Sequence, residues 1–364
     1  MYRAMFAITL LCITIALAPA QYHAQADKTQ AALDALVNDL NAETGSTLVV
    51  TVATPDATWT ATAGDAHDAQ VVLASDRFRI GSMSKTFLAV VALRLAEDGV
   101  LNLDDLASTW LPDTLTARIA NADSVTLRNL LGMRSGIADY LATDEFWAVV
   151  AADPARVWTA QDALIYAYDL PAEFAPDAQF AYSNSNYLLL QIALETATTL
   201  PLHTLIRDII LDPLSLEATY TQISETLPGG FVSSLTDWDG DGTVEDVSTL
   251  NDGAGLGDGG LISNTADLTT FYHAFLRDQT LLNEDSMGQI LAFQDAEGQG
   301  YSLGLNEWET DQLGAAWGHA GGVVGFLSLG VYLPDYETTV IILSAGDGFD
   351  IEQLAIQALA LVLE

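Results

Sequence analysis

The first hundred residues alternate between segments with helical periodicity and segments in which β-forming residues cluster. Apolar residues that recur every three or four positions predict a helix, whereas runs of β-formers bounded by turn residues predict strands. The predicted elements are a helix over 27–42, a hairpin of strands 47–52 and 58–63 around Pro55-Asp56, a short strand over 77–80 and a helix over 86–97.

The pattern becomes mainly helical from about residue 103 to residue 250, with breaks at Pro and Gly. The C-terminal part again mixes both types: a helix beginning near Asn264, strands over 301–305, 323–333 and 338–343, and a helix over 351–363. The 364 residues exceed one ordinary core. We therefore expect an α/β domain formed by residues 27–102 and 255–364, with residues 103–254 as an inserted, mainly helical domain.

The N-terminus has the features of a secretory signal. Arg3 precedes an apolar run over 4–18, and two small-x-small cleavage sites follow before residue 27. We predict a signal peptide over 1–26 and a secreted or periplasmic/cell-envelope protein, with an uncleaved anchor as the alternative. No later segment is long and apolar enough to span a membrane, and the only cysteine, Cys12, lies inside the predicted signal. The mature chain is therefore expected to lack disulfides and Cys-ligated zinc.

The charge balance limits the partners. The chain has 12 Lys and Arg against 49 Asp and Glu, a formal charge of −37. Such a surface repels nucleic acid and anionic membranes, so we expect neither as a partner. A protein adapted to concentrated salt has this composition, because salt screens the self-repulsion. A lineage bias towards acidic exported proteins is the alternative explanation.

Candidate chemistry begins with the scarce lysines. The chain contains only Lys28 and Lys85, and Lys85 follows Ser82 by three residues at the predicted start of a helix. Positions i and i+3 share a helix face, so the ammonium is expected beside the hydroxyl. A serine hydroxyl becomes a good nucleophile when a neighbour accepts its proton. The Ser-x-x-Lys spacing also arises by chance, and it needs support from other motifs.

Two further segments offer such support. Tyr182 and Asn184 precede an apolar helix, where a phenol can move protons and an amide can orient a carbonyl. A helix N-cap formed by Ser183 or Asn184 is the alternative. His319 lies in a glycine-rich segment before a β-rich run, where it can present a titratable donor. A structural histidine in a glycine-rich turn is the alternative.

Together these segments resemble a known family. The motifs are, in chain order, Ser82-x-x-Lys85, Tyr182-x-Asn184 and His319-x-Gly321, supported by the stretches 78–81, 130–137 and 259–263. Their order and separations resemble those of the penicillin-recognising serine hydrolases. The similar branch contains class C β-lactamases, related D-alanyl-D-alanine carboxypeptidases, esterases and D-amino-acid peptidases. The resemblance implies an α/β (α+β) fold in which an antiparallel sheet, built from both chain ends, is flanked by helices and carries a mainly helical insertion.

The resemblance also implies roles for individual residues. It makes Ser82 the acylated nucleophile, Lys85 its activating neighbour, Tyr182 a proton-transfer residue, Asn184 the partner of Lys85 and of the substrate amide, and His319 the occupant of a position that many members fill with lysine. The backbone N–H groups of Ser82 and Gly322 would form the oxyanion hole. Whether Lys85 or Tyr182 removes the serine proton is left open by the spacing. No metal or organic cofactor is required for this acyl transfer.

The chain departs from the family where substrate carboxylates are usually bound. No Lys or Arg follows Arg277, and Ala320 lacks the hydroxyl often found in the middle of the third motif. The resemblance implies an exported serine hydrolase that acts through an acyl-enzyme on a small-molecule or peptide substrate. The missing cations lead us to expect that this substrate is an ester or amide without a free carboxylate. The alternative is a catalytically silent protein that binds a peptide or cell-wall fragment. A conventional α/β-hydrolase is disfavoured, because the chain has no Gly-x-Ser-x-Gly elbow.

One acidic segment resembles a calcium loop. Asp237, Asp239 and Asp241 occupy positions 1, 3 and 5, Gly242 occupies position 6, and Thr243 follows as a further candidate ligand. Position 12 lacks the bidentate glutamate of an EF-hand. A structural calcium ion at this loop and a solvated acidic turn are therefore both open readings.

Overall fold

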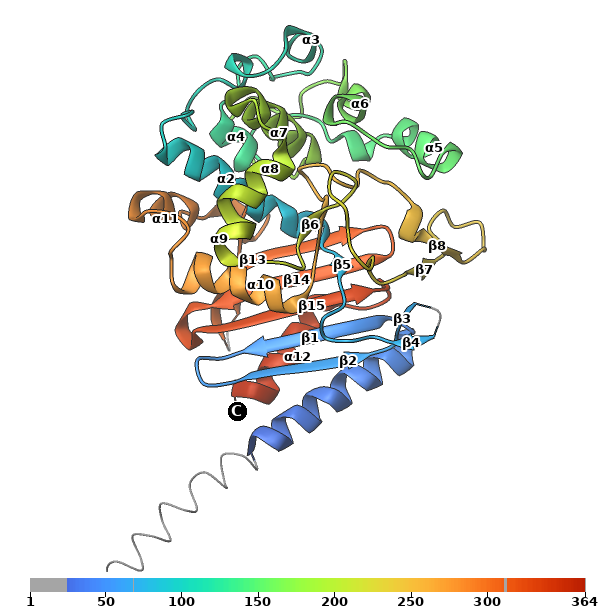
Figure 1. Ribbon diagram of the computed structural model, residues 1–364. Helices are drawn as coiled ribbons and strands as arrows, with labels where there is room; N and C mark the ends of the chain where they lie inside the picture. Colours follow the sequence, from blue (N-terminus) through green and yellow to red (C-terminus); the bar gives the residue numbers. More distant parts are fainter. Residues whose placement is uncertain (1–24, 68, 311–312, 364) are drawn as a thin grey trace, which may run out of the picture.

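The computed structural model describes residues 25–67, 69–310 and 313–363 (Figure 1). The predicted signal peptide over 1–26 lies almost entirely outside this range. Within the described residues, no helix combines the length and the apolar character needed to cross a membrane.

An eight-stranded antiparallel sheet forms the centre of the molecule, in the order β10-β11-β12-β13-β14-β15-β1-β2. Its strands are β1 (Thr47–Ala53), β2 (Thr58–Ala63), β10 (Gln294–Ala296), β11 (Gln299–Tyr301), β12 (Asn306–Thr310), β13 (Gly314–Val323), β14 (Phe326–Leu333) and β15 (Thr338–Ala345). The two ends of the chain meet where β1 pairs with β15, with Val50 opposite Ile342. The expected sheet built from both chain ends is therefore confirmed.

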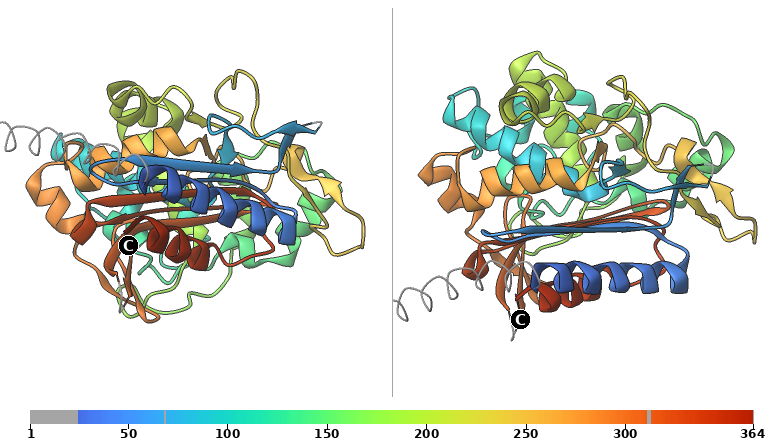
Figure 2. Two further views of the ribbon diagram at one scale, coloured as in Figure 1. Left: turned by 90° about the horizontal axis from the view of Figure 1, so that it is seen from below. Right: turned by 60° about the horizontal axis from the view of Figure 1, so that its bottom comes forward.

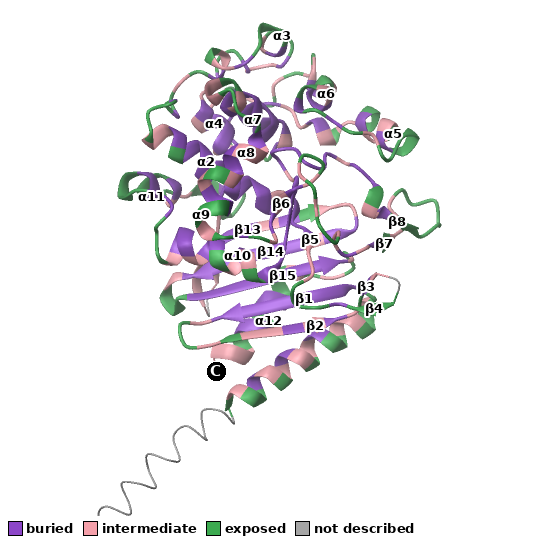
Figure 3. Cartoon of the chain, viewed as in Figure 1, coloured by how far each residue is buried: buried purple, intermediate pink, exposed green. Residues whose placement is uncertain are grey.

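Both faces of the sheet are buried, which explains why β1 reads as a nearly continuous apolar run. Val50 and Ile342 belong to an apolar cluster with the helix over 25–44 and α12 (Ile351–Leu363). Val49 and Ile341, which point the other way, join the larger core beneath the remaining helices. Figure 2 shows the two terminal helices on one side of the sheet and the other helices on the opposite side. Figure 3 shows the resulting burial of the central strands.

The helical region lies over the second face. Its helices are α2 (Ser84–Glu97), α3 (Asp113–Thr116), α4 (Leu127–Leu131), α5 (Asp144–Ala152), α6 (Ala160–Leu164), α7 (Asn184–Thr198), α8 (Leu202–Ile206) and α9 (Asp212–Leu214), followed later by α10 (Thr265–Tyr272) and α11 (Glu284–Ile290). α2 packs against both α7 and α8 and against β13. One apolar core therefore joins the helical region to the sheet, and the boundaries at 102/103 and 254/255 stay predictions.

Three small sheets lie outside the central one. They are β5 (Phe78–Arg79) with β9 (Leu261–Ser263) and β6 (Tyr220–Thr221), β3 (Asp65–His67) with β4 (Gln70–Val71), and β7 (Leu235–Thr236) with β8 (Glu245–Asp246). The first matters most for the site, because β5 leads directly into the turn that carries Ser82.

Two predicted strand boundaries are wrong. Residues 301–305 do not form one strand: β11 ends at Tyr301, and a tight turn with Gly304 at φ +76° precedes β12. The strand predicted over 323–333 begins later, because Gly325, at φ +79°, closes a hairpin between β13 and β14. The glycine-rich third motif is consequently part of β13 and does not form a turn. Its Gly318 is required because a Cβ there would collide with the carbonyl of Gly330 on β14.

Candidate active site

Ser82 lies in a single 3-10 turn, Gly81–Met83, between β5 and α2. Gly81 has a φ of +48°, and a Cβ at this position would lie 2.9 Å from the backbone nitrogen of Gly322 on β13. A side chain at Gly81 would therefore push the turn away from the strand. Because Gly81 has no side chain, the backbone of this turn can approach β13 closely, and Ser82 and Gly322 line one cavity.

The same close approach depends on the glycine of the third motif. A Cβ on Gly321 would lie 3.0 Å from the backbone nitrogen of Ser82 and would overlap the carbonyl of Ile80. Ser328 on β14 donates its hydroxyl to that carbonyl at 2.7 Å, which fixes the segment before the nucleophile. Ser82 and Gly322 are thus adjacent, as an oxyanion hole requires, and their role as donors stays a prediction.

Lys85 is fully buried and reaches Ser82 as the spacing predicts. Its Nζ donates to Ser82 Oγ at 2.9 Å, to Asn184 Oδ1 at 2.8 Å and to the carbonyl of Asp258 at 2.5 Å. These three acceptors match the three N–H donors of an ammonium group. A neutral amine has only two donors and a lone pair. Since Asn184 Oδ1 and the carbonyl can only accept, the lone pair would then face Ser82, the one partner with a proton to give.

Asn184, the first residue of α7, is held in one orientation from the far side. Its Nδ2 donates to Asp139 Oδ2 at 2.9 Å, and its Oδ1 accepts from Lys85. Asp139 also accepts from the backbone of Leu141 at 3.1 Å, as the cap of a short turn. A carboxylate only accepts and an ammonium only donates, so the Asn184 amide has one allowed orientation between them. The alternative that Ser183 or Asn184 caps α7 through its side chain is not realised, since no such bond forms.

Tyr182 lies over the lysine at the entrance. Its ring centroid is 5.0 Å from Lys85 Nζ, and its side chain is 39% exposed. Tyr301 contacts the ring edge-on at a centroid distance of 6.4 Å. No hydrogen bond of the Tyr182 hydroxyl is found among the described residues, so this group is available to a substrate.

His319 lies behind this entrance and is only 3% exposed. Its Nδ1 lies 2.5 Å from the carbonyl of Ala320, so Nδ1 carries the proton and Nε2 is unprotonated. Within the described chain, Nε2 is buried without a partner. Burial, and then the positive charge of Lys85, lower the pKa of His319 to about 3. The imidazole is therefore neutral at pH 7, and its ring packs near Tyr182 and Tyr301 at 6.4 and 6.1 Å.

Two carboxylates of the site, Asp139 and Asp258, were missed from the sequence. Asp258 accepts from the Tyr140 hydroxyl at 2.8 Å, and burial raises its pKa to about 6 against the lowering effect of Lys85. Burial also raises the pKa of Asp139, against the hydrogen bond from Asn184. Asp258 directly precedes the stretch 259–263, and Asp139 follows the stretch 130–137 after one intervening residue; both stretches support the family resemblance. Their position next to these stretches could have marked them as candidate site residues. Their contacts with Lys85 and Asn184 become visible only in the folded structure.

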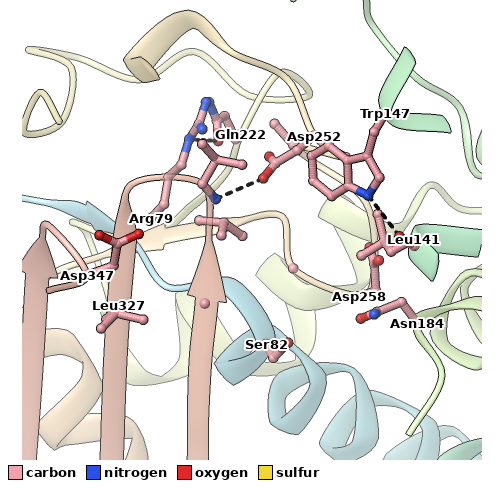
Figure 4. A pocket seen from close by; sticks show the side chains of 16 residues that line it. Arg79, Ser82, Leu141, Trp147, Asn184, Gln222, Asp252, Asp258, Leu327 and Asp347 are labelled. Carbon is pink, nitrogen blue, oxygen red and sulfur yellow. Dashed lines mark hydrogen bonds between the residues drawn. The ribbon is translucent and has the colours of Figure 1, made fainter. Parts of the chain in front are cut away.

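The cavity in front of Ser82 has a volume of about 270 Å³ (Figure 4). Its titratable lining residues are Arg79, Asp252, Asp258 and Asp347. Trp147 and Leu141 form an apolar wall, and Figure 4 shows them on the same side as Asn184. The cavity thus joins Ser82 to a partly aromatic and mainly acidic surface.

The acidic segment of the candidate calcium loop lies in the hairpin loop between β7 and β8. Carboxylate oxygens of Asp237, Asp239 and Asp241 lie within 4.8 Å of one another on exposed side chains. The loop is closed by backbone donors, including Thr243 N to Asp241 at 2.7 Å and Gly242 N to Asp237 at 3.0 Å. Such bonds are also expected of an acidic turn without metal, so calcium binding stays a prediction.

The comparisons with known proteins agree with this geometry. The profile described as Beta-lactamase matches residues 33–364. The chain belongs to the beta-lactamase family. Among solved structures of the same fold, a D-stereospecific amidohydrolase from Streptomyces sp. is 29% identical, with a TM-score of 0.80 over 91% of this chain and 97% of that one. The D-amino acid amidase from Ochrobactrum anthropi SV3 superposes with a TM-score of 0.79 at 20% identity, over 93% and 99% of the two chains, which shows the fold alone.

Curated relatives of this beta-lactamase family member include a penicillin-binding protein and a D-alanyl-D-alanine-carboxypeptidase/endopeptidase. Penicillin-binding protein 4* of Bacillus subtilis is 26% identical over 298 residues, 73% of this chain and 60% of that protein. The D-alanyl-D-alanine-carboxypeptidase/endopeptidase AmpH of Escherichia coli K12 is 26% identical over 62% of this chain and 59% of that protein. The chain thus matches about three-fifths of the length of these relatives. Family and relatives together support an acyl-transfer hydrolase and confirm the resemblance seen in the sequence.

Proposed function

We propose that the chain is an exported serine hydrolase that forms an acyl-enzyme at Ser82 and cleaves an ester or amide without a free carboxylate. The observation that carries the proposal is the 2.9 Å hydrogen bond between Lys85 Nζ and Ser82 Oγ, held from behind by Asn184 and the Asp258 carbonyl. It supplies both a nucleophile and a buried group able to take its proton.

In the proposed acylation, the Ser82 oxygen bonds to the substrate carbonyl carbon while its proton passes to neutral Lys85. The new oxyanion lies towards the backbone N–H groups of Ser82 and Gly322. Collapse breaks the bond to the leaving group, which takes a proton from the Lys85 ammonium directly or through the Tyr182 hydroxyl. Water then attacks the acyl-enzyme by the reverse proton route. Direct contact of Lys85 with Ser82 favours Lys85 over Tyr182 as the acceptor of the serine proton.

The proposed exclusion of carboxylates rests on the third motif. Its histidine is neutral and enclosed, and no Lys or Arg follows Arg277 to replace a cation there. Substrates such as penicillins and D-Ala-D-Ala peptides would leave their carboxylate without a partner in an acidic surrounding. The amidohydrolase from Streptomyces supports amides as one substrate class.

The test is labelling and turnover. A fluorophosphonate should label the wild type at Ser82 and should not label Ser82→Ala, and p-nitrophenyl acetate should be hydrolysed far faster than nitrocefin. A folded wild type that resists labelling would instead support the silent binding protein. Faster turnover of nitrocefin would contradict the exclusion of carboxylates. The export proposal predicts a mature N-terminus near residue 27 when the protein is recovered outside the cytoplasm and analysed by mass spectrometry.

A further inference from the structure

The positive charges around the cavity are not available to a substrate. Arg79, three residues before the nucleophile, lines the cavity but is only 3% exposed. Its guanidinium donates inward, to Gln222 Oε1 at 3.1 Å and to the carbonyls of Ser248 at 3.1 Å and Leu250 at 2.8 Å. Its remaining nitrogen, Nη1, is enclosed by protein and makes no hydrogen bond among the described residues. Lys85 uses all three of its donors on Ser82 and the groups behind it, so neither cation can receive a carboxylate.

The negative charges behave differently. The Asp258 carboxylate is enclosed and accepts a hydrogen bond from the Tyr140 hydroxyl. Asp252 and Asp347 also line the cavity, and neither is fully buried. The charge of Arg79 attracts Asp252, and it offsets at most one carboxylate. A ligand in this cavity therefore meets available carboxylates and no available cation, within a protein of formal charge −37.

Asp252 is the better positioned of the two. Its Oδ2 accepts from the backbone of Val324, in the turn between β13 and β14, at 3.1 Å, and Oδ1 accepts nothing from the described chain. The loop around Asp252 is also fixed, because Asn251 Oδ1 accepts from the backbone of Gly253 at 3.1 Å and of Ala254 at 2.7 Å. One carboxylate oxygen is thus held in place while the other stays free, which is the arrangement of a preorganised acceptor.

Trp147 adds a second feature that suits a cation. Its indole Nε1 donates to the carbonyl of Leu141 at 2.8 Å, which fixes the ring as a wall of the cavity. Trp147 and Asp252 line the same cavity, and Figure 4 draws both above Ser82 and Asn184. An ammonium group near a tryptophan face gains a cation–π attraction in addition to its ion pair.

We propose that the cavity binds a substrate with a cationic amino group close to the scissile carbonyl, and that Asp252 is the residue that binds this amino group. The substrate class is an amide, ester or peptide of an amino acid whose amino group is free. The volume of about 270 Å³ lies just below the range of about 300–1,000 Å³ of drug-sized ligand sites, which suits one aminoacyl group. This inference deepens the proposed function, on which it rests.

The test compares alanine p-nitroanilides that differ only at the amino group: free amine, N-acetyl and N-succinyl, each as both enantiomers. We expect kcat/KM to fall in that order, by about tenfold from the amine to the acetyl substrate. Acetylation removes the positive charge, so the substrate can no longer form an ion pair in the partly desolvated site. The preference should shrink as the pH rises past about 8, where an α-amino group loses its proton. An N-acetyl substrate that equals or exceeds the amine would overturn the inference and leave the proposed function intact.

A matched pair of variants tests the assignment to Asp252. Asp252→Asn keeps an oxygen that accepts from Val324 and removes the charge, whereas Asp347→Asn removes one charge from the exposed side of the same cavity. The amine-to-acetyl ratio should fall about tenfold in the first variant and less than about threefold in the second. If the amine-to-acetyl ratio fell equally in both variants, the preference would come from the overall negative potential of the cavity, and the specific role of Asp252 would be overturned.

A binding measurement separates this inference from catalysis. In Ser82→Ala, alaninamide should bind at least about fivefold more tightly than N-acetylalaninamide by calorimetry, and Asp252→Asn in that background should remove the difference. Equal affinities would refute the amine site whether or not the wild type is a hydrolase. A clear difference without Ser82 labelling in the wild type would support the site and refute the proposed function.

Discussion

The two faces of the central sheet bury very different side chains. The face beneath the terminal helices is closed by aliphatic residues such as Val50, Ile342 and Leu354. On the opposite side lie the four Asp, Glu, Lys, Arg or His side chains that the described chain buries to below a tenth of their surface: Arg79, Lys85, Asp258 and His319. All four lie at or beside the cavity of Ser82. Burying a charged group costs free energy. Its restriction to one face suggests that this face serves the chemistry at Ser82, whereas the apolar face serves the stability of the fold.

The largest expected effect tests this separation with the two lysines. Lys85→Met removes the buried amino group beside Ser82 and should lower kcat for p-nitrophenyl acetate by about 10³-fold or more, because Ser82 loses its proposed proton acceptor. Lys28→Met changes the other lysine, exposed on the helix that covers the apolar face. Steady-state kinetics should show a change below about twofold for Lys28→Met. Comparable losses in both variants would contradict the separation.

The next effect lies on the apolar face. Leu354 of α12 is 2% exposed, so Leu354→Ala should lower the free energy of unfolding by about 2–5 kcal/mol through lost burial and a residual cavity. Because no catalytic group is near, kcat of the folded enzyme should stay within about twofold. Chemical denaturation and active-site titration measure the two quantities. A large fall in kcat at full occupancy of the native state would show that the faces are coupled.

A smaller effect is expected from the proton affinity of Asp258. Its pKa is raised to about 6, so the folded state binds this proton more tightly than the unfolded state does. The corresponding stability is present below about pH 4 and is lost as the pH rises through 6, by up to about 3 kcal/mol. Asp258→Asn keeps an acceptor for Tyr140 and should therefore gain stability over the wild type between pH 4.5 and 7. A difference independent of pH would contradict this account.

The smallest effect concerns orientation. Asp139→Ala removes the acceptor that holds Asn184 and should lower kcat about 10- to 100-fold with little change in KM, because Lys85 loses a fixed partner. Asp139→Asn still offers an oxygen to Asn184 and should restore most of kcat. Equal losses in the two variants, or a loss confined to the melting temperature, would show that Asp139 has only a structural role.

Much of the fold was predictable because its signals are local. The hairpin of β1 and β2, the helix after Ser82 and the terminal helix over 351–363 follow from periodicity and turn residues. The boundary errors at β11 and β14 arose where glycines with positive φ, Gly304 and Gly325, break an apolar run. Glycine within a strand and glycine in a turn look alike in one sequence, so β13 was not recognised around His319.

The candidate site was predictable only where residues form motifs. Ser82 and Lys85 are three positions apart, and helix geometry alone brings them together. Asp258 is 173 positions from Lys85, and its carbonyl contact arises because β9 follows it and pairs with β5. The neutral state of His319 was equally hidden, since it depends on enclosure by Tyr301 and neighbouring residues. Long-range contacts and burial are properties of the fold and leave no local pattern.

The pairing of β1 with β15 has a consequence for the growing chain. β1 pairs with β15, which lies about 300 residues later in the chain. This pairing raises the contact order, and the entropy lost in closing so long a loop delays the pairing during folding. A ribosome-bound chain ending before β13 contains Ser82 and Lys85 but not the strand carrying Gly322. The proposed reactive centre would therefore be assembled only after β13 has emerged, so a shorter nascent chain would lack the strand that the proposed acyl transfer at Ser82 requires.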